Sequence, residues 1–149
     1  MRLTLYSDYS LRVLLYLALN FDKPATIKEI ATSYDISKNH LMKVASGLKQ
    51  AGYVKAIRGR SGGLLLARKP TEINIGAVIR TTEEDFKIVE CFDPETNTCC
   101  IAPNCRLQNI LNEAIQAFIA VLDKYSLHDL TKTETLLRKS LGIEIKANQ

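Results

Sequence analysis

The sequence predicts a mainly α-helical fold that carries one small β-hairpin. Three observations support this prediction. Apolar residues recur at helical spacing through most of the first 50 residues, a short extended segment with a glycine-rich turn follows, and a long apolar stripe begins after residue 105. Two short helices, a tight turn and a hairpin in this order are typical of a winged helix-turn-helix. We therefore expect a winged helix-turn-helix plus a long dimerisation helix.

A first helix is expected over residues 4–20, where apolar residues recur every three or four positions. Asp8 falls in its first turns, and the segment from Asp22 to Pro24 would end it. The spacing predicts an amphipathic helix whose apolar positions are Leu5, Leu11, Leu14, Leu15, Ala18 and Leu19.

Capping signals define a helix-turn-helix that spans Lys28 to Ala51. Thr26 and Glu29 form a capping box that opens its first helix. Ser37 can cap the second helix of the pair, and Gly52 can supply the left-handed residue that stops it. This second helix should bury one face, made of Leu41, Val44, Ala45 and Leu48.

After Gly52 the pattern becomes extended on both sides of a basic, glycine-rich tip, which predicts a β-hairpin between residues 53 and 67. A short helix that Asn74 can cap should follow at about residues 75–82. Residues 83–104 have no apolar period and contain acidic residues, two Xaa-Pro pairs and most of the cysteines, so we expect a loop.

The longest apolar stripe runs from Arg106 to Tyr125, which corresponds to a helix of roughly 30 Å. Such a face needs a partner, and in a small winged-helix protein that partner is usually the same helix of a second subunit. We expect a homodimer through this helix, with packing on its own domain as the alternative. Short helices should follow after Ser126, which pairs with Asp129 as a cap, and at residues 133–141.

Charge divides the chain unevenly. Residues 1–80 carry 13 Lys or Arg against 5 Asp or Glu, whereas residues 81–149 carry 7 against 11. A basic half joined to an acidic half suits a DNA-facing domain with a regulatory element. We assign residues 1–82 to a DNA-binding winged helix-turn-helix domain, 83–105 to a cysteine-rich cluster-binding loop, and 106–149 to the dimerisation helix and C-terminal helices.

Several classes of protein are excluded by the same sequence. No stretch approaches the roughly 20 apolar residues that span a bilayer, and the first residues lack the pattern of a signal peptide. We therefore expect a cytoplasmic protein with no membrane partner. No nucleophile elbow, phosphate-binding loop or dinucleotide fingerprint is present, so we expect no enzymatic activity.

The second helix of the pair and the hairpin tip carry polar and basic residues that suit double-stranded DNA. A helix fits the major groove, where Asn39 and His40 could reach base edges while lysines contact phosphates. Arginines of the hairpin tip would lie along the adjacent minor groove. A solvated helix face is the ordinary alternative, but the order of the elements favours DNA. The expected contacts are Ser37, Lys38, Asn39, His40, Lys43, Arg58 and Arg60.

The four cysteines are Cys91, Cys99, Cys100 and Cys105. Zinc sites usually contain pairs of cysteines two to four residues apart, and these spacings disfavour zinc. Three thiolates from one flexible loop and a ligand from elsewhere can hold an iron–sulfur cluster, because the bridging sulfides set the geometry. Adjacent cysteines project in different directions, so we expect only one of Cys99 and Cys100 to bind. A redox disulfide switch and free surface thiols are the alternatives.

Seven short segments together form a specific pattern. They are Met1 to Thr4, Ser7 to Arg12, Ile36 to Lys43, Val54 to Gly63, Val89 to Pro94, Cys105 to Leu107 and Leu122 to Leu127. On these segments the chain resembles the Rrf-two family of winged-helix transcription regulators over residues 1 to about 131, and within it the repressors that sense nitric oxide.

The resemblance implies a homodimeric repressor in which Cys91, Cys99 and Cys105 bind an iron–sulfur cluster, of the 4Fe–4S rather than the 2Fe–2S type. Asp8 of the partner subunit would be the fourth ligand, and a carboxylate is a weaker donor to iron than a thiolate. Attack by nitric oxide would then destroy the cluster and release the DNA, so that genes for nitric-oxide detoxification are expressed.

Two other branches of the family share part of this pattern. Regulators of iron–sulfur biogenesis have a histidine three residues after the last cysteine, where this chain has Gln108. Rhizobial iron regulators resemble this chain in the spacing of the cysteines, but they are of the type that has asparagine at the position of Asp8. The resemblance therefore favours nitric-oxide sensing, with iron sensing by the same cluster, or metal-free thiol–disulfide regulation, as alternatives.

Overall fold

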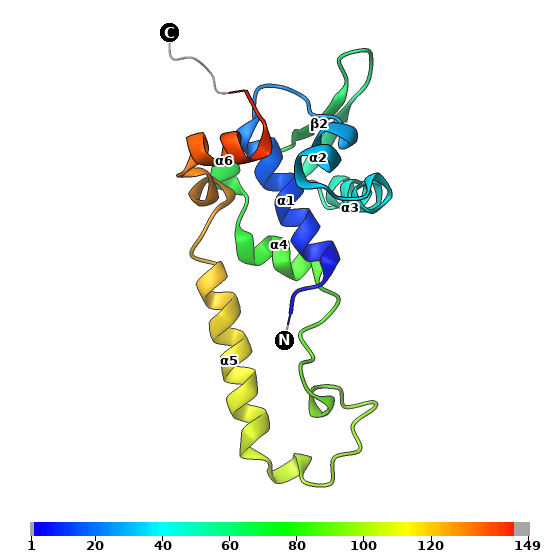
Figure 1. Ribbon diagram of the computed structural model, residues 1–149. Coiled ribbons are helices and arrows are strands. Elements are labelled where there is room, and N and C mark those ends of the chain that lie inside the picture. The colour runs from blue at the N-terminus through cyan, green and yellow to red at the C-terminus, as the bar shows by residue number, and fades with distance from the viewer. Residues whose placement is uncertain (1, 145–149) are drawn as a thin grey trace.

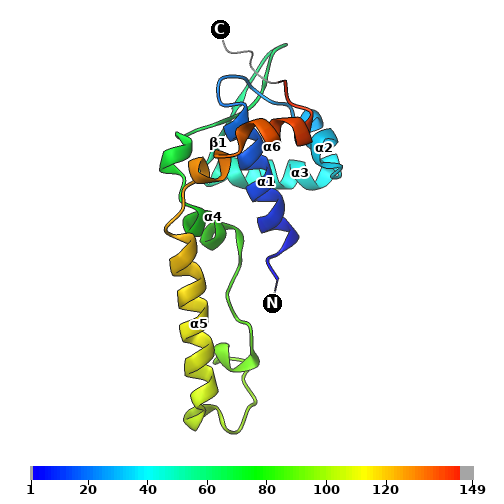
Figure 2. The ribbon, with the colours of Figure 1, turned by 60° about the vertical axis from the view of Figure 1, so that its left-hand side comes forward.

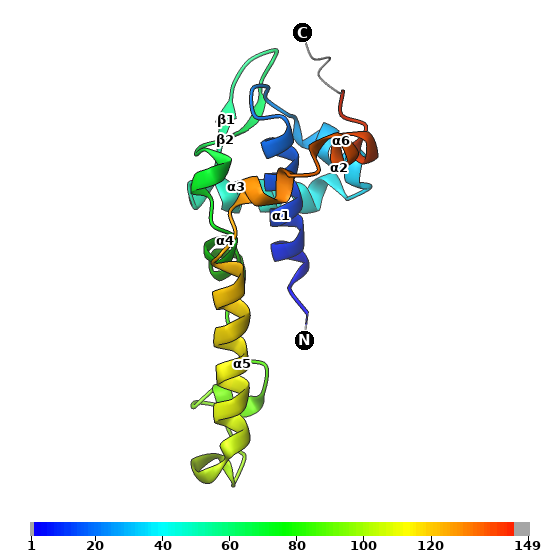
Figure 3. The ribbon, with the colours of Figure 1, turned by 90° about the vertical axis from the view of Figure 1, so that its left-hand side faces the viewer.

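Most of the chain packs around the first helix, α1 (Leu5–Leu19), while a long helix, α5 (Arg106–Leu122), projects away from this body. The computed structural model describes residues 2–144. We call α5 and the loop before it, residues 83–105, the arm, and the rest the body (Figure 1). Figures 2 and 3 show from two other directions that α5 extends away from the body. The fold is mainly helical with one two-stranded hairpin, as the sequence predicts.

Helix α1 is confirmed, but it is not amphipathic in the predicted way. Thr4 caps its first turn by accepting a hydrogen bond from the Ser7 amide. Later elements of the body pack on several sides of α1, so that even Ser7 is fully buried and donates to Thr82 Oγ1 at 2.7 Å. Leu5, by contrast, is 65% exposed because it lies in the first turn, at the edge of the body.

The helix-turn-helix consists of α2 (Ile27–Tyr34) and α3 (Lys38–Gln50). Thr26 and Glu29 form the predicted capping box, with the Thr26 amide donating to Glu29 at 2.6 Å. The left-handed residue Gly52 follows α3, also as predicted. Ser37 stands at the N-cap position of α3, but its side chain makes no capping hydrogen bond and is exposed to solvent.

The hairpin, or wing, pairs β1 (Val54–Ile57) with β2 (Gly63–Leu66) in antiparallel register, Val54 opposite Leu66. Its strands lie next to α3 and α1, and its exposed tip, residues 58–61, lies at the end of the body opposite the arm (Figures 1–3). A bridge between Ala25 and Leu64 ties the wing to the segment before α2.

Helix α4 (Ile75–Thr82) connects the body to the arm, because it packs on both α1 and α5. Asn74 caps α4 as predicted, accepting from the Ala77 amide at 2.9 Å. Residues 83–104 form the predicted loop, interrupted by two single 3-10 turns at Glu90–Phe92 and Ala102–Asn104.

Helix α5 is shorter than the sequence predicts. It ends at Leu122, and Tyr125 lies in the following turn, where its carbonyl accepts a hydrogen bond from the Ile75 amide at 2.9 Å. Tyr125 therefore continues the apolar spacing in the sequence without belonging to the helix, and its side chain is 47% exposed. Within residues 2–144, no helix combines the length and apolar character needed to cross a membrane.

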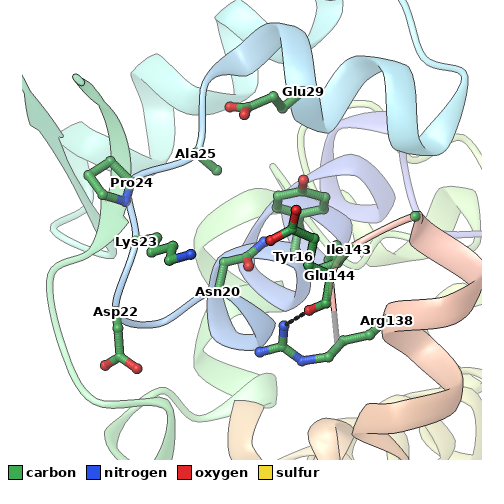
Figure 4. A pocket seen from close by; sticks show the side chains of 11 residues that line it. Tyr16, Asn20, Asp22, Lys23, Pro24, Ala25, Glu29, Arg138, Ile143 and Glu144 are labelled. Atoms are coloured by element: carbon green, nitrogen blue, oxygen red, sulfur yellow. Dashed lines mark hydrogen bonds between the residues drawn. The ribbon is translucent and has the colours of Figure 1, made fainter. Parts of the chain in front are cut away.

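The C-terminal part returns to the body. Ser126 and Asp129 form the predicted cap of a 3-10 turn, Leu127–Thr131, and α6 (Glu134–Leu141) follows; residues 145–149 of the predicted C-terminal part lie outside the described residues. Arg138 of α6 is buried and donates to the carbonyls of Leu19 and Glu144. It lines a pocket of about 590 Å³ beside the end of α1 (Figure 4), and its hydrogen bond to Leu19 fastens α6 to α1.

Candidate DNA-binding surface and cysteine loop

Helix α3 buries the four predicted residues and turns its opposite face to solvent. Within residues 2–144, its lysines Lys38 and Lys43 form no ion pair, nor do Arg58 and Arg60 at the wing tip. Their charges therefore stay available to an anionic partner. All seven predicted DNA contacts are exposed, five at the start of α3 and two on the wing: Ser37, Lys38, Asn39, His40, Lys43, Arg58 and Arg60.

Two residues that the sequence reasoning missed extend the same face. Met42 follows Asn39 by three residues and Ser46 follows Met42 by four, and both are exposed. This periodicity was available in the sequence, because residues three or four apart share one face of a helix. The outward face of α3 therefore continues for at least two turns beyond its first residues.

A close crossing sets the position of α3 against α1. Tyr6 packs on Gly47, so closely that a Cβ atom at position 47 would lie 1.8 Å from the Tyr6 hydroxyl oxygen. Two turns before Gly47 on α3, the ring of His40 lies beside that of Tyr9, with centroids 6.2 Å apart. Side chains from the first turns of α1 therefore contact the recognition face of the helix-turn-helix directly.

Asp8 lies in the same stretch of α1 and pairs with Arg12, at 2.8 Å from Nη2 and 3.1 Å from Nε. The Arg12 guanidinium also lies 5.8 Å from the ring centres of both Tyr9 and Tyr34. Burial raises the pKa of Tyr34 to about 12, and the buried Tyr34 hydroxyl has no hydrogen-bond partner among residues 2–144. Asp8 itself is 40% exposed, so a second molecule can approach its carboxylate.

In the arm, a hydrogen bond brings the first and last cysteines toward the same helix end. Cys105 is the N-cap residue of α5, and Gln108 in the first turn of α5 donates from Nε2 to the Cys91 carbonyl at 2.7 Å. The turn that contains Cys91 is therefore held against the start of α5. Sequence reasoning noted Gln108 only as a missing histidine and did not foresee this contact.

Two consecutive turns join Cys99 to Cys105. The Ala102 amide donates to the Cys99 carbonyl at 3.2 Å, and the Cys105 amide donates to the Ala102 carbonyl at 3.3 Å. Cys91, Cys99 and Cys105 are partly buried, whereas Cys100 is exposed.

The first part of the cysteine segment is also closed by hydrogen bonds and an ion pair. Glu90 accepts hydrogen bonds from the Thr98 amide and hydroxyl at 2.5 and 2.6 Å, and these bonds lower the pKa of Glu90. Lys87 pairs with Asp93 at 2.9 Å. The segment is therefore a closed loop of defined shape rather than an open connector.

Among the described residues, no three His, Cys, Asp or Glu side chains are arranged to hold a single metal ion. The cysteine loop lies toward the far end of the arm, whereas the first turns of α1 belong to the body (Figure 1). A single chain thus brings Cys91, Cys99 and Cys105 into one loop, but it does not bring Asp8 to them.

A winged helix-turn-helix with an exposed, basic second helix defines a DNA-binding transcription regulator. The comparison with protein families makes this assignment specific, because the Rrf2 model, described as an iron-dependent transcriptional regulator, matches residues 3–133. The chain belongs to the Rrf2 family, which confirms the resemblance seen in its sequence segments.

Individual relatives agree with this assignment. The chain is 56% identical to the HTH-type transcriptional regulator NsrR of Bacillus subtilis, over 97% of this chain and 99% of the relative. Among solved structures, it is similar to IscR of T. potens (TM-score 0.73, 26% identity, 89% of this chain and 88% of the other). It is also similar to CymR, the global cysteine regulator of B. subtilis (TM-score 0.69, 30% identity, 89% and 98%). These relatives are regulators rather than enzymes, as the sequence predicts for this chain.

Proposed function

We propose that this Rrf2-family regulator is a homodimeric repressor that holds an iron–sulfur cluster and releases its operator when nitric oxide destroys that cluster. The observation that carries the proposal is the single loop that contains Cys91, Cys99 and Cys105, in which a hydrogen bond holds the turn of Cys91 against the start of α5 and two turns join Cys99 to Cys105. The high identity to NsrR over nearly the whole chain supports it.

For DNA binding, residues 1–82 supply the helix that enters the major groove and the wing beside it. Asn39 and His40 are exposed near the start of α3, where a recognition helix contacts base edges. The unpaired cations of α3 and of the wing tip would neutralise phosphates.

For dimerisation, α5 carries an apolar seam that its own chain does not cover. Ile115 and Ile119 are buried, but Leu107, Ile110 and Val121 are between 49% and 59% exposed. Successive members of the seam alternate spacings of three and four residues, which is the pattern of helices that pack side by side. A second copy of α5 would cover it. The exposed seam consists of Leu107, Ile110, Ala114, Ala117 and Val121.

For the cofactor, the donors present fit an iron–sulfur cluster better than a single ion. The three thiols sit in one loop without a ready single-ion site, and a cluster brings its own sulfides to span such separations. Cys105 lies at the N-cap of α5, at the start of the arm helix. Cys91, Cys99 and Cys105 would hold the cluster, of the 4Fe–4S type, with the partner's Asp8 as fourth ligand.

The bound cluster would supply the iron that nitric oxide attacks. Once the cluster is lost, Asp8 has another partner ready, because Arg12 lies one turn further along α1. The Asp8–Arg12 pair contacts Tyr9, whose ring neighbours His40 on the recognition helix. Exchange of the Asp8 partner would therefore change the packing beside α3 and lower the affinity for the operator.

Anaerobic titration tests this proposal. Protein purified without oxygen should be brown, should contain iron and acid-labile sulfide, and should lose its visible absorbance and its operator binding in the same nitric-oxide titration. Cys105→Ala should abolish the cluster, whereas Cys100→Ala should leave it intact, because Cys100 is exposed while the other three cysteines are partly buried. A colourless, iron-free protein from anaerobic cells would refute the proposal and favour a thiol–disulfide switch.

Iron sensing through the same cluster is the second candidate, since the matching family is described as an iron-dependent regulator. It predicts operator binding that follows the iron supply and does not respond to stoichiometric nitric oxide. In either case Arg58→Ala should leave the iron content unchanged. It should also reduce the dependence of log affinity on log salt concentration by about 0.9, the value for one phosphate contact.

A further inference from the structure

Met42 is an exposed apolar side chain on the outward face of the recognition helix. It is 50% exposed, whereas its sequence neighbour Leu41 is fully buried in the core. Asn39 precedes it by three residues and Ser46 follows it by four, and both are exposed and polar. The buried side of α3 thus needs no methionine here, and packing within the chain does not explain the residue.

The surroundings of Met42 match one feature of the major groove. Each base pair presents a distinct set of donors and acceptors there, and thymine alone among the four bases adds a methyl group. Lys38 and Lys43 flank Met42 with unpaired charges that would hold the helix against phosphates on either side. Methionine is flexible and polarisable, so its thioether can adapt to a methyl group at the groove floor.

We propose that Met42 contacts a thymine 5-methyl group in the major groove and thereby determines specificity for thymine at one position of each half-site. The inference rests on the proposed DNA binding through α3 and adds the base that this helix selects. Asn39 and His40 would supply polar contacts next to this position, while Met42 supplies a contact that no hydrogen bond can replace.

The test begins with selection of duplexes from a random-sequence pool by the full chain, purified anaerobically. Each thymine of the selected duplex is then replaced by uracil, which removes only the methyl group. At one symmetry-related pair of positions, uracil should weaken binding by about fourfold per half-site, the effect of losing one buried methyl group, and about fifteenfold in total.

A double-mutant cycle assigns that loss to Met42. Met42→Ala should weaken binding to the thymine duplex by a similar factor and should bind the thymine and uracil duplexes equally. Met42→Leu should retain part of the preference for thymine, and Ser46→Ala, on the same face, should retain all of it. Circular dichroism spectra of the variants establish that α3 is still folded.

Two results overturn the inference while the proposed function stands. One is a selected duplex whose affinity is unchanged by uracil at every position, and the other is a uracil penalty that Met42→Ala retains in full. If the wild-type chain selects no sequence from the pool, the proposed DNA binding through α3 fails as well.

Discussion

Replacing Gly47 by alanine tests the crossing that positions the recognition helix. Gly47 lies inside α3, and a glycine-to-alanine change within a helix normally stabilises a protein by about 1 kcal/mol. Here the new methyl group would lie 1.8 Å from the Tyr6 hydroxyl oxygen and 3.1 Å from the ring carbon Cζ that bears it. Tyr6 must therefore leave its place between α1 and α3.

The structure sets the expected size of the effect. Tyr6 is half-buried against the core, and forced overpacking of this kind costs about 1–3 kcal/mol. After the gain in helix propensity, Gly47→Ala should lower the free energy of unfolding by up to about 2 kcal/mol. Tyr6→Phe removes the hydroxyl oxygen that the new methyl group would meet. In the Tyr6→Phe variant, Gly47→Ala should therefore show most of the stabilisation expected from its higher helix propensity. The two changes should couple by at least about 1 kcal/mol.

Urea unfolding of the wild type, the two single variants and the double variant, all at one protein concentration, measures this coupling. Ser46→Ala is the matched control, because position 46 is exposed on the same helix and should gain only about 0.5 kcal/mol. Operator affinity should fall with Gly47→Ala and recover in the double variant. Simple additivity, or a stabilisation of about 1 kcal/mol by Gly47→Ala alone, would refute the reasoning.

Three further predictions concern the arm and the C-terminal part. Ile110→Asp should convert the dimer to monomers in sedimentation experiments, whereas Asn109→Asp, on the adjacent polar face, should not; an unchanged dimer in both cases would exclude the α5 seam. Gln108→Leu removes the hydrogen bond to the Cys91 carbonyl and should speed cluster loss to a chelator about fivefold, the equivalent of one hydrogen bond, and an unchanged rate would count against this positioning role. The Lys132 ammonium and the Ser126 amide and hydroxyl lower the pKa of Asp129, so its contribution to stability should be present at neutral pH and be lost as pH falls below about 4. Urea midpoints at pH 7 and about pH 3 should differ less in Asp129→Asn than in the wild type, and equal differences would contradict this assignment.

The local elements were predictable because their signals act within one turn of the chain. Thr26 and Glu29 are three residues apart, and their capping box forms wherever that segment turns into a helix. Gly52 is left-handed as predicted, since few other residues adopt that conformation after a helix. The exposed face of α3 and the exposed wing tip follow from the same local periodicities, as do the candidate DNA contacts.

Other features depend on contacts between segments that are distant in the sequence, and local sequence patterns do not predict such contacts. Leu5 looks like a core residue by spacing, yet the body ends before it and leaves it exposed. Tyr125 continues the α5 stripe in sequence but lies past the helix end, where it contacts the start of α4. The hydrogen bond from Gln108 to Cys91 likewise exists only because the loop folds back on α5.

The sequence by itself determined the order of helices, the wing and the family, and it supplied the candidate cluster ligands, because periodicity, caps and ligand types are properties of neighbouring residues. Only the tertiary structure decided that Tyr6 fixes α3 through Gly47 and that Cys91 is held against the start of α5. Such contacts arise from the packing of whole elements, since a side chain finds its partner only after the chain between them has folded.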